Sequence, residues 1–290
     1  MDLILSKYFG PCYGVSRAFN EAIKSDSKVK ILGNIAHNQL LIDKLKQNKN
    51  IEIVQDISEI NENDKVIIRT HGLPLEQLGK LRQKKCKIID QTCSNVKLVQ
   101  KIAEKAEKER KTLILTGNSG HPEVIGISSR CKSTFIISNT GDLKDLLTNS
   151  NLDLSNCIIA SQTTFNSDKF ENICNFLKIY YPEIKIYNTI CGDSLKRKNE
   201  IIKISNFVDL CVVIGDKNSS NSVALFDFSK KFCESVFAEN VVRFDFNILN
   251  KKNRIFITSG ASVLKETVML FVNKISNLFK YNNVRIKCIV

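Results

Sequence analysis

The chain has 290 residues, of which 43% are hydrophobic and 25% are charged, a composition typical of a soluble globular protein with two or three small domains. No apolar run reaches the roughly 18 residues that a membrane span requires, and the N-terminus shows no signal-peptide pattern. We therefore expect a cytoplasmic protein with no membrane partner, whose ten cysteines are reduced thiols or metal ligands rather than disulfides.

The net charge of +13 allows three interpretations. Nucleic-acid binding is one of them. We favour solvated lysine faces on amphipathic helices, as in KLVQKIAEKAEKERK (97–111), because no basic stripe with interleaved aromatic residues is present. We therefore expect no nucleic-acid partner. The third interpretation is a positive field that attracts an anionic substrate or an acidic electron-carrier protein.

Short apolar runs rich in β-branched residues alternate with helical stretches, which is typical of parallel α/β units. In chain order, strands are expected at 2–6, 29–32, 51–54, 65–69, 87–90, 112–115, 134–138, 157–160, 184–188, 209–215, 241–244, 254–258 and 284–290. Helices are expected at 15–24, 40–47, 170–181, 224–232 and 265–275, and also after residues 74, 93 and 191.

Three cysteines follow a strand and a polar turn and precede a helical stretch: Cys12, Cys93 and Cys191. Thiolates delivered singly by three similar units indicate one shared metal centre, and we expect an iron–sulfur cluster there. The alternative is that each is an inert small hydrophobic residue. We interpret four other cysteines, which lie inside predicted strands or on helix faces, as inert residues of this kind: Cys157, Cys174, Cys211 and Cys233.

The third unit lacks a closing strand, and the N-terminal strand is left over. We expect residues 2–8 to complete the third sheet, with 284–290 packed nearby, so that the chain closes into a ring. The expected α/β domains are 13–92, 93–190 and 191–283 with 1–12, followed by a C-terminal strand or tail at 284–290.

Polar residues follow the strands in matching order, where parallel sheets bind ligands. The first loop of each unit gives His37, His121 and Ser219, at 25, 28 and 28 residues after that unit's cysteine. The second loop gives His71, Thr163 and Ser262. Donors at helix N-termini favour phosphate, and the run 217–222 (KNSSNS) is dense in them. The alternative is that the Ser and Asn residues are only helix N-caps, but caps alone do not need matched histidines.

Three thiolates on a cubane cluster leave one iron without a protein ligand, and an open metal position binds and polarises a substrate oxygen. Glu123, in the sequence His121-Pro122-Glu123, is the best-placed acid. Burial near an anionic ligand raises a carboxyl pKa, which suits proton donation. The alternative for Glu123 is a solvent-facing carboxylate in a first helical turn. Asp193 and Asp216 are weaker candidates for the same role.

The chain resembles the IspH (LytB) family of 4-hydroxy-3-methylbut-2-enyl diphosphate reductases. The resemblance covers about residues 10–265, and the cysteine order, GHPE and KNSSNS are its most specific parts. The matching segments are GPCYGVSRA, AHNQLLIDKL, RTHGLP, DQTCSNV, GNSGHPEVIG, SQTTFNSD, TICGDSLKR, KNSSNS and TSGAS.

The resemblance implies an α/β fold of three similar domains with mainly parallel sheets, arranged as a pseudo-threefold trefoil around a central [4Fe-4S] cluster. It implies that Cys12, Cys93 and Cys191 bind the cluster and that the substrate hydroxyl coordinates the open iron. Glu123, helped by Thr163, would deliver the proton. The diphosphate would be surrounded by His37, His71, His121, Ser219, Ser220, Asn221 and Ser262.

The implied reaction is a two-electron reductive dehydroxylation that gives isopentenyl and dimethylallyl diphosphate, the last step of the non-mevalonate isoprenoid pathway. The implied electron donor is a ferredoxin or a flavodoxin-type carrier. Four residues depart from the usual pattern, and the two aspartates add negative charge: Pro11, Tyr13, Asp193 and Asp216. Two competing hypotheses are a non-enzymatic iron–sulfur sensor or carrier on the same fold and a basic nucleic-acid-binding protein.

Overall fold

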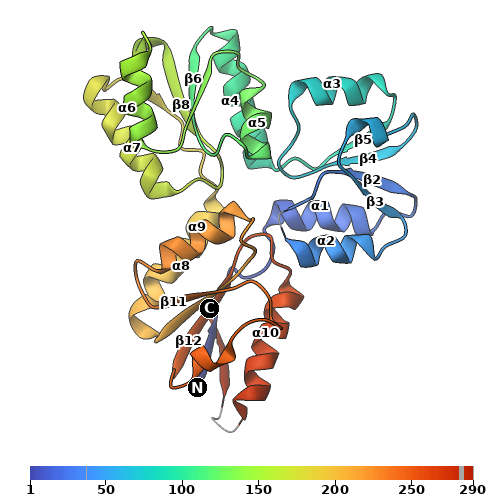
Figure 1. The fold of residues 1–290 in the computed structure, drawn as a ribbon, viewed down its shortest axis with the longest axis vertical. Coiled ribbons are helices and arrows are strands. Elements are labelled where there is room, and N and C mark those ends of the chain that lie inside the picture. The colour runs from blue at the N-terminus through green and yellow to red at the C-terminus, as the bar shows by residue number, and fades with distance from the viewer. Residues whose placement is uncertain (37, 281–283, 290) are drawn as a thin grey trace. The chain divides into compact units, whose positions relative to one another are not determined.

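The computed structural model describes residues 1–36, 38–280 and 284–289, and these form three parallel β-sheets with α-helices packed beside them (Figure 1). Every strand pair is parallel. The expected α/β class with three parallel-sheet domains is therefore confirmed. No helix within the described ranges is long and apolar enough to cross a membrane.

The chain divides into two compact units. Unit 1 comprises Met1–Ser16, Ala36–Leu45 and Gly192–Val290, and unit 2 comprises Arg17–Ile35 and Lys46–Cys191. Unit 2 contains the first two sheets, and unit 1 contains the third.

The first sheet has the strand order β3-β2-β4-β5. Its strands are β2 (Val29–Leu32), β3 (Ile51–Val54), β4 (Lys65–Ile68) and β5 (Lys87–Asp90). The helices of this part of the chain are α1 (Tyr13–Ile23), α2 (Gln39–Lys46) and α3 (Leu75–Gln83).

The second sheet repeats this topology as β7-β6-β8-β9. Its strands are β6 (Thr112–Thr116), β7 (Thr134–Ile137), β8 (Cys157–Ser161) and β9 (Lys185–Ile186). The helices are α4 (Ser94–Lys108), α5 (Pro122–Ser128), α6 (Thr140–Asn149) and α7 (Ser167–Tyr180). On α4, Val99 and Ala103 are buried while Lys101 and Lys108 are exposed, as the expected solvated lysine face requires.

The third sheet has the order β11-β10-β12-β1-β13. Its strands are β1 (Asp2–Leu5), β10 (Leu210–Ile214), β11 (Ser235–Ala238), β12 (Arg254–Ser259) and β13 (Arg285–Cys288), and its helices are α8 (Gly192–Ile204), α9 (Ser220–Ser229) and α10 (Lys265–Leu278). All of β10 is buried, as expected of a parallel strand that is covered on both faces.

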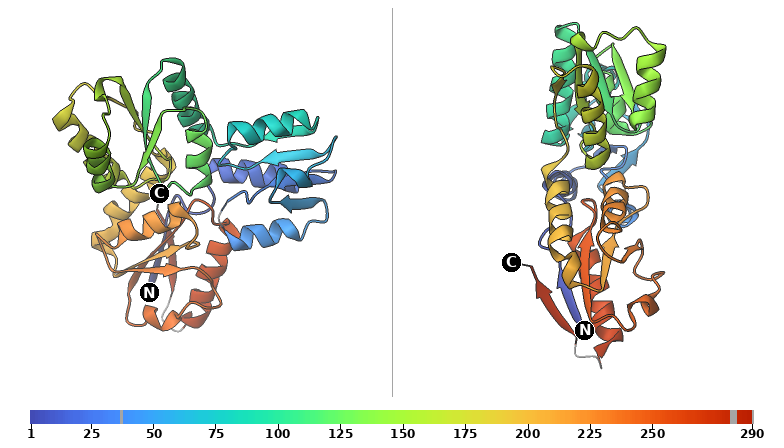
Figure 2. Two further views of the ribbon diagram at one scale, coloured as in Figure 1. Left: turned by 45° about the horizontal axis from the view of Figure 1, so that its top comes forward. Right: turned by 90° about the vertical axis from the view of Figure 1, so that its left-hand side faces the viewer.

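The N-terminal strand completes the third sheet, as the sequence predicted. Leu3 of β1 pairs with Ile255 of β12, and Leu3 and Leu5 belong to the buried core of unit 1. In Figure 1 this dark-blue strand lies among the orange and red strands. The C-terminal strand β13 pairs with the other edge of β1, and Figure 2 shows it at the edge of the sheet.

Two local predictions were wrong. The strand expected at 241–244 is a turn, and Val242 is 90% exposed there. The strand lies earlier, because Ser235–Ala238 pairs with Cys211–Ile214 of β10. The helix α6 was not expected, although Asn139 caps it by accepting hydrogen bonds from the Gly141 and Asp142 amides.

Candidate active site

The three cysteines singled out from the sequence share one local geometry. Cys12, Cys93 and Cys191 each stand directly before a helix, at the starts of α1, α4 and α8. Each cysteine donates its backbone N–H to a carbonyl oxygen of the loop that follows a central strand of a sheet. The acceptors are Ala261 for Cys12 (2.9 Å), Thr70 for Cys93 (3.0 Å) and Thr163 for Cys191 (2.8 Å).

The three acceptors also occupy one equivalent position in their sheets. Ala261, Thr70 and Thr163 each lie two residues beyond the last residue of a strand, Ser259 in β12, Ile68 in β4 and Ser161 in β8. The repeat inferred from strand order is thus also a repeat of backbone hydrogen bonding around the cysteines.

The chemistry of these cysteines fits thiolate ligation of an iron–sulfur cluster. All three are partly exposed and form no disulfide, and a helix N-terminus stabilises a thiolate. By contrast, burial raises the pKa of the Cys157 and Cys174 thiols to about 11. Unit 2 contains Cys93 and Cys191, and unit 1 contains Cys12. Within either unit, the described residues form no group of three His, Cys, Asp or Glu side chains that would bind a metal ion.

A hydrogen bond to one of these sulfurs was not foreseen. The Asn95 side-chain amide donates to Cys191 Sγ over 3.2 Å. Asn95 lies in the first turn of α4, two residues after Cys93, so this turn is adjacent to one candidate ligand and contacts another. The sequence DQTCSNV contained no sign of it, because the contact joins residues 96 positions apart.

Glu123 is buried in unit 2, with only 1% of its surface exposed. Its carboxylate accepts hydrogen bonds from the Thr163 backbone N–H (2.6 Å) and the Thr163 hydroxyl (2.9 Å). Burial is the largest influence and raises the pKa of Glu123 to about 7, although the two hydrogen bonds act to lower it. The solvent-facing alternative for Glu123 is therefore wrong, and the carboxyl has the pKa of a proton donor at neutral pH.

The local sequence explains how Glu123 is positioned. His121 is the N-cap of α5 and Pro122 is its first residue, where the missing N–H of proline costs nothing. His121 Nδ1 accepts a hydrogen bond from the Glu123 backbone N–H at 3.2 Å. The neutral ring therefore has its proton on Nε2, where it is a donor.

A second histidine lies beside this pair. The rings of His71 and His121 meet edge to face with centroids 5.2 Å apart. Gly72 follows with φ +74°, and a side chain there would collide with the Gln100 amide. The glycine of the THGLP loop thus allows the turn that brings His71 against His121.

Unit 1 contains a cluster of buried hydroxyl and amide groups at the N-terminus of α9. Ser219, Asn221 and Ser262 are each at most 9% exposed. The Ser262 hydroxyl lies 3.4 Å from the Ser219 hydroxyl, and Asn221 Oδ1 accepts the Ala261 backbone N–H at 2.8 Å. Ser220 is the first residue of α9. A helix N-terminus lined by neutral donors is suited to an anion.

Two glycines allow these loops to approach each other. A Cβ on Gly260 would lie 2.0 Å from Ser222 Oγ, and a Cβ on Gly215 would lie 2.5 Å from Ser222 Cβ. The Ser222 hydroxyl is buried and has no hydrogen-bond partner in the part of the chain that the structure describes. It is a further donor in this cluster.

The matched order of the loop residues is confirmed for two of the three first loops and is off by one residue in the second loops. His121 and Ser219 each lie five residues beyond a strand, after Thr116 and Ile214. His37 has the same spacing from Leu32 in the sequence but lies outside the described residues. In the second loops, His71 and Ser262 lie three residues beyond their strands, whereas Thr163 lies two beyond and corresponds to Thr70 and Ala261.

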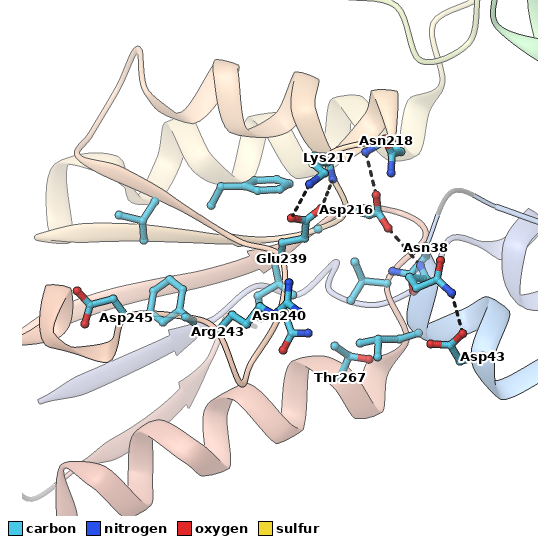
Figure 3. A pocket seen from close by; sticks show the side chains of 18 of the residues that line it. Asn38, Asp43, Asp216, Lys217, Asn218, Glu239, Asn240, Arg243, Asp245 and Thr267 are labelled. Carbon is cyan, nitrogen blue, oxygen red and sulfur yellow. Dashed lines mark hydrogen bonds and ion pairs between the residues drawn. The ribbon is translucent and has the colours of Figure 1, made fainter.

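Both weaker acid candidates already accept hydrogen bonds or form ion pairs. Asp193 forms an ion pair with Arg197 at 2.9 Å. Asp216 accepts hydrogen bonds from the Gln39 N–H (3.2 Å) and the Asn218 N–H (2.8 Å). Asp216 lines a hollow of about 570 Å³ in unit 1, beyond β10 and β11 (Figure 3). Both aspartates are only half-buried, whereas Glu123 is fully buried.

The sequence profile of the LytB protein family matches residues 3–276. The chain belongs to the LytB family. One LytB relative, from Campylobacter fetus subsp. fetus, is named 4-hydroxy-3-methylbut-2-enyl diphosphate reductase. It is 34% identical over 280 residues, which cover 96% of this chain and 98% of the relative.

Two solved structures are similar to this chain over nearly all of its length. One is the E-1-hydroxy-2-methyl-but-2-enyl-4-diphosphate reductase from Plasmodium falciparum, with a TM-score of 0.90 and 27% identity over 99% of this chain and 92% of that one. The other is described as (E)-4-hydroxy-3-methyl-but-2-enyl diphosphate reductase, the terminal enzyme of the non-mevalonate pathway. It has a TM-score of 0.70 and 29% identity over 95% of this chain and 99% of that one.

Proposed function

We propose that the protein is a 4-hydroxy-3-methylbut-2-enyl diphosphate reductase, an iron–sulfur oxidoreductase of the non-mevalonate isoprenoid pathway. It converts its substrate to isopentenyl and dimethylallyl diphosphate. The reaction replaces C–OH by C–H, and it consumes two electrons and two protons and releases one water. Membership of the LytB family supports the reaction, and the buried Glu123–Thr163 pair is the observation that carries its proton chemistry.

Cys12, Cys93 and Cys191 are the proposed ligands of a [4Fe-4S] cluster with one open iron. When bound, the cluster supplies the two electrons and a Lewis-acidic iron for the substrate hydroxyl. The equivalent helix-start positions of the three thiols support this ligand set. Ferredoxin or a flavodoxin-type protein is the proposed electron donor. The proposed location is the cytoplasm, with no nucleic-acid partner.

The proposed ligands of the diphosphate are neutral donors. Three of them are imidazoles, those of His37, His71 and His121. The others are hydroxyl and amide groups of Ser219, Ser220, Asn221 and Ser262. Buried hydroxyl, amide and imidazole donors bind a phosphate oxygen through charge-assisted hydrogen bonds, which are roughly twice as strong as neutral ones.

Glu123 is the proposed acid. With a pKa of about 7, it carries a proton in a large fraction of molecules at neutral pH. The protonated carboxyl donates to the departing hydroxyl, which leaves as water. The Thr163 hydroxyl and backbone N–H then stabilise the carboxylate that remains, since both already donate to it.

We also propose three domains with the boundaries 13–92, 93–190, and 191–283 with 1–12, followed by 284–290. The first two proposed domains each contain one complete sheet, and the third contains β1, β10, β11 and β12 of the third sheet, to which 284–290 adds β13. The placement of β1 in the third sheet supports joining residues 1–12 to the third domain.

The test is an anaerobic turnover assay after reconstitution with iron and sulfide. Reduced methyl viologen is oxidised in the presence of 4-hydroxy-3-methylbut-2-enyl diphosphate, and the products are five-carbon diphosphates. Cys12→Ala loses turnover together with a stable cluster, whereas Glu123→Gln loses turnover and keeps the cluster. A complete cluster whose spectrum does not respond to the substrate would instead support the sensor or carrier hypothesis.

A further inference from the structure

Two buried charged residues of α8 have no role in the proposed reaction. Arg197 is 2% exposed and Glu200 is 5% exposed, which is unusual for these residue types unless their charges are paired. They are three residues apart, so they lie on the same face of the helix. Both side chains bind the segment that leads to Cys12.

Arg197 bonds two other segments of unit 1 and one residue of its own helix. Its guanidinium donates to the Gly10 carbonyl at 2.9 Å and to the Ser259 carbonyl at 2.8 Å, and it forms an ion pair with Asp193 at 2.9 Å. Gly10 lies two residues before Cys12, and Ser259 lies three residues before Ser262. One buried side chain thus joins the cysteine turn to the end of β12.

Three further hydrogen bonds stabilise the contact between the cysteine turn and the loop after β12. The Gly10 N–H donates to the Ser259 hydroxyl at 2.9 Å, and the Cys12 N–H donates to the Ala261 carbonyl at 2.9 Å. The Ala261 N–H in turn donates to Asn221. The cysteine turn and the loop with the anion-binding hydroxyls therefore form one hydrogen-bonded piece.

Glu200 fixes the start of the same segment. Its carboxylate accepts the Lys7 N–H at 2.7 Å and also a hydrogen bond from the Ser6 hydroxyl. Between these contacts and Arg197, the chain turns at Gly10, which has φ +90°. The turn lacks regular secondary structure, so its position depends on these side-chain contacts.

We propose that Arg197 is a positioning residue, which fixes the turn that carries Cys12 to the loop that carries Ser262. The proposal rests on the proposed function only in giving Cys12 and Ser262 their roles. Removal of the guanidinium leaves two buried carbonyl groups without their donor, which specifically loosens the Cys12 turn. The guanidinium contacts described above are with Gly10, Ser259 and Asp193, so we expect the labelling of Cys93 and Cys191 to change less than that of Cys12.

The test measures each cysteine separately in the full-length protein. The reconstituted protein is treated with a ferrous chelator and iodoacetamide, and mass spectrometry follows the labelling of Cys12, Cys93 and Cys191. In the Arg197→Met variant, Cys12 is labelled about tenfold faster relative to the other two, the factor that corresponds to about 1.4 kcal/mol. Arg197→Lys, which keeps one donor group, restores part of the difference.

The matched control is Asp209→Ala. Asp209 accepts the Asn253 and Arg254 N–H groups at the opposite end of β12, so this variant also loses two side-chain hydrogen bonds on the same strand. Its three cysteines keep the wild-type labelling ratio. Equal acceleration of all three cysteines in Arg197→Met, or no change at Cys12, would overturn the proposal.

The labelling experiment also works on protein without a cluster. If the protein takes up no cluster, the proposed function fails, but the labelling ratio of the three cysteines is still measured, without the chelator. A milder variant provides a second test. Asp193→Ala removes only the ion pair that orients Arg197 and raises relative Cys12 labelling about two- to threefold. An unchanged ratio in Asp193→Ala and in Arg197→Lys would also contradict the proposal.

Discussion

Units 1 and 2 contain different chemistry at the ends of their strands. In unit 2, a buried carboxyl lies against a threonine, and two imidazole rings are in contact. In unit 1, the corresponding positions carry the hydroxyl and amide groups of Ser219, Asn221 and Ser262, none of which titrates near neutral pH. A carboxyl whose pKa is near neutrality transfers a proton, whereas neutral donors only bind and orient. In the proposed function, only the unit 2 loops supply an acid, whereas the unit 1 loops supply donors for the diphosphate alone.

The largest expected effect is that of removing the acid in unit 2. Glu123→Gln has nearly the same shape but no transferable proton, and we expect kcat to fall by about 10²- to 10⁴-fold. Steady-state kinetics with reduced methyl viologen measure this, and Glu171→Gln, an exposed carboxylate on α7, is the control. A loss confined to KM would mean that Glu123 binds the substrate and does not donate the proton.

The same carboxyl makes the stability of the protein depend on pH. Its pKa is about 7 in the folded chain and about 4.5 in the unfolded chain, so the folded state binds more protons between these values. The free energy of unfolding therefore decreases as pH rises from 4.5 to about 7, by on the order of 3 kcal/mol. Urea unfolding of wild type and Glu123→Gln across this range measures the effect. Identical slopes in the two proteins would contradict it.

Variants in unit 1 are expected to change binding and not proton transfer. Ser262→Ala removes a buried hydroxyl from a loop proposed to bind the diphosphate, and we expect KM to rise about tenfold with kcat little changed. Ser276→Ala removes a hydroxyl that bonds within α10 and is the control. A fall in kcat with unchanged KM in Ser262→Ala would contradict the proposal that the unit 1 donors serve binding and not catalysis.

Thr163→Val alters the acid without removing it. The hydroxyl that donates to Glu123 is lost and the backbone N–H remains, so one influence that lowers the pKa of Glu123 disappears. We expect that pKa to rise and the acid to be weaker, with a several-fold lower kcat. Thr163→Ser keeps the hydroxyl and stays close to wild type. The pH profile of kcat/KM separates the two variants.

The smallest expected effect concerns the sulfur of Cys191. Asn95→Leu removes its hydrogen-bond donor, and hydrogen bonds to sulfur raise the potential of an iron–sulfur cluster. We expect a lower midpoint potential in this variant and little change in Asn95→Gln. Anaerobic redox titration gives the two values, and equal potentials would show that the contact does not tune the cluster.

Much of the fold was predictable because strand order and cysteine position are properties of the linear sequence. The N-terminal strand was assigned to the third sheet because that unit lacked a closing strand, and the Leu3–Ile255 pairing confirms it. Strand order along the sequence could not decide whether SVFA (235–238) or VVRF (241–244) forms the strand. Both are apolar runs, and only pairing with β10 distinguishes them.

The site was predictable in its residue types but not in its environments. The burial of Glu123 depends on packing against Thr163, which is 40 residues away in the chain. The lysines and arginine of GDSLKRK are typical of a solvated helix face. Arg197 is nevertheless buried, because carbonyl groups distant in the sequence accept hydrogen bonds from its guanidinium. Neither fact can be obtained from local periodicity.

The pH dependence of kcat/KM for the reconstituted wild type and Glu123→Gln tests the account most directly, because kcat/KM reports groups of the free enzyme. We expect wild-type kcat/KM to fall as pH rises through about 7, when Glu123 loses its proton, and this limb to be absent from the residual activity of Glu123→Gln. A wild-type profile without the limb, or the same limb in both proteins, would contradict the assignment of Glu123 as the acid.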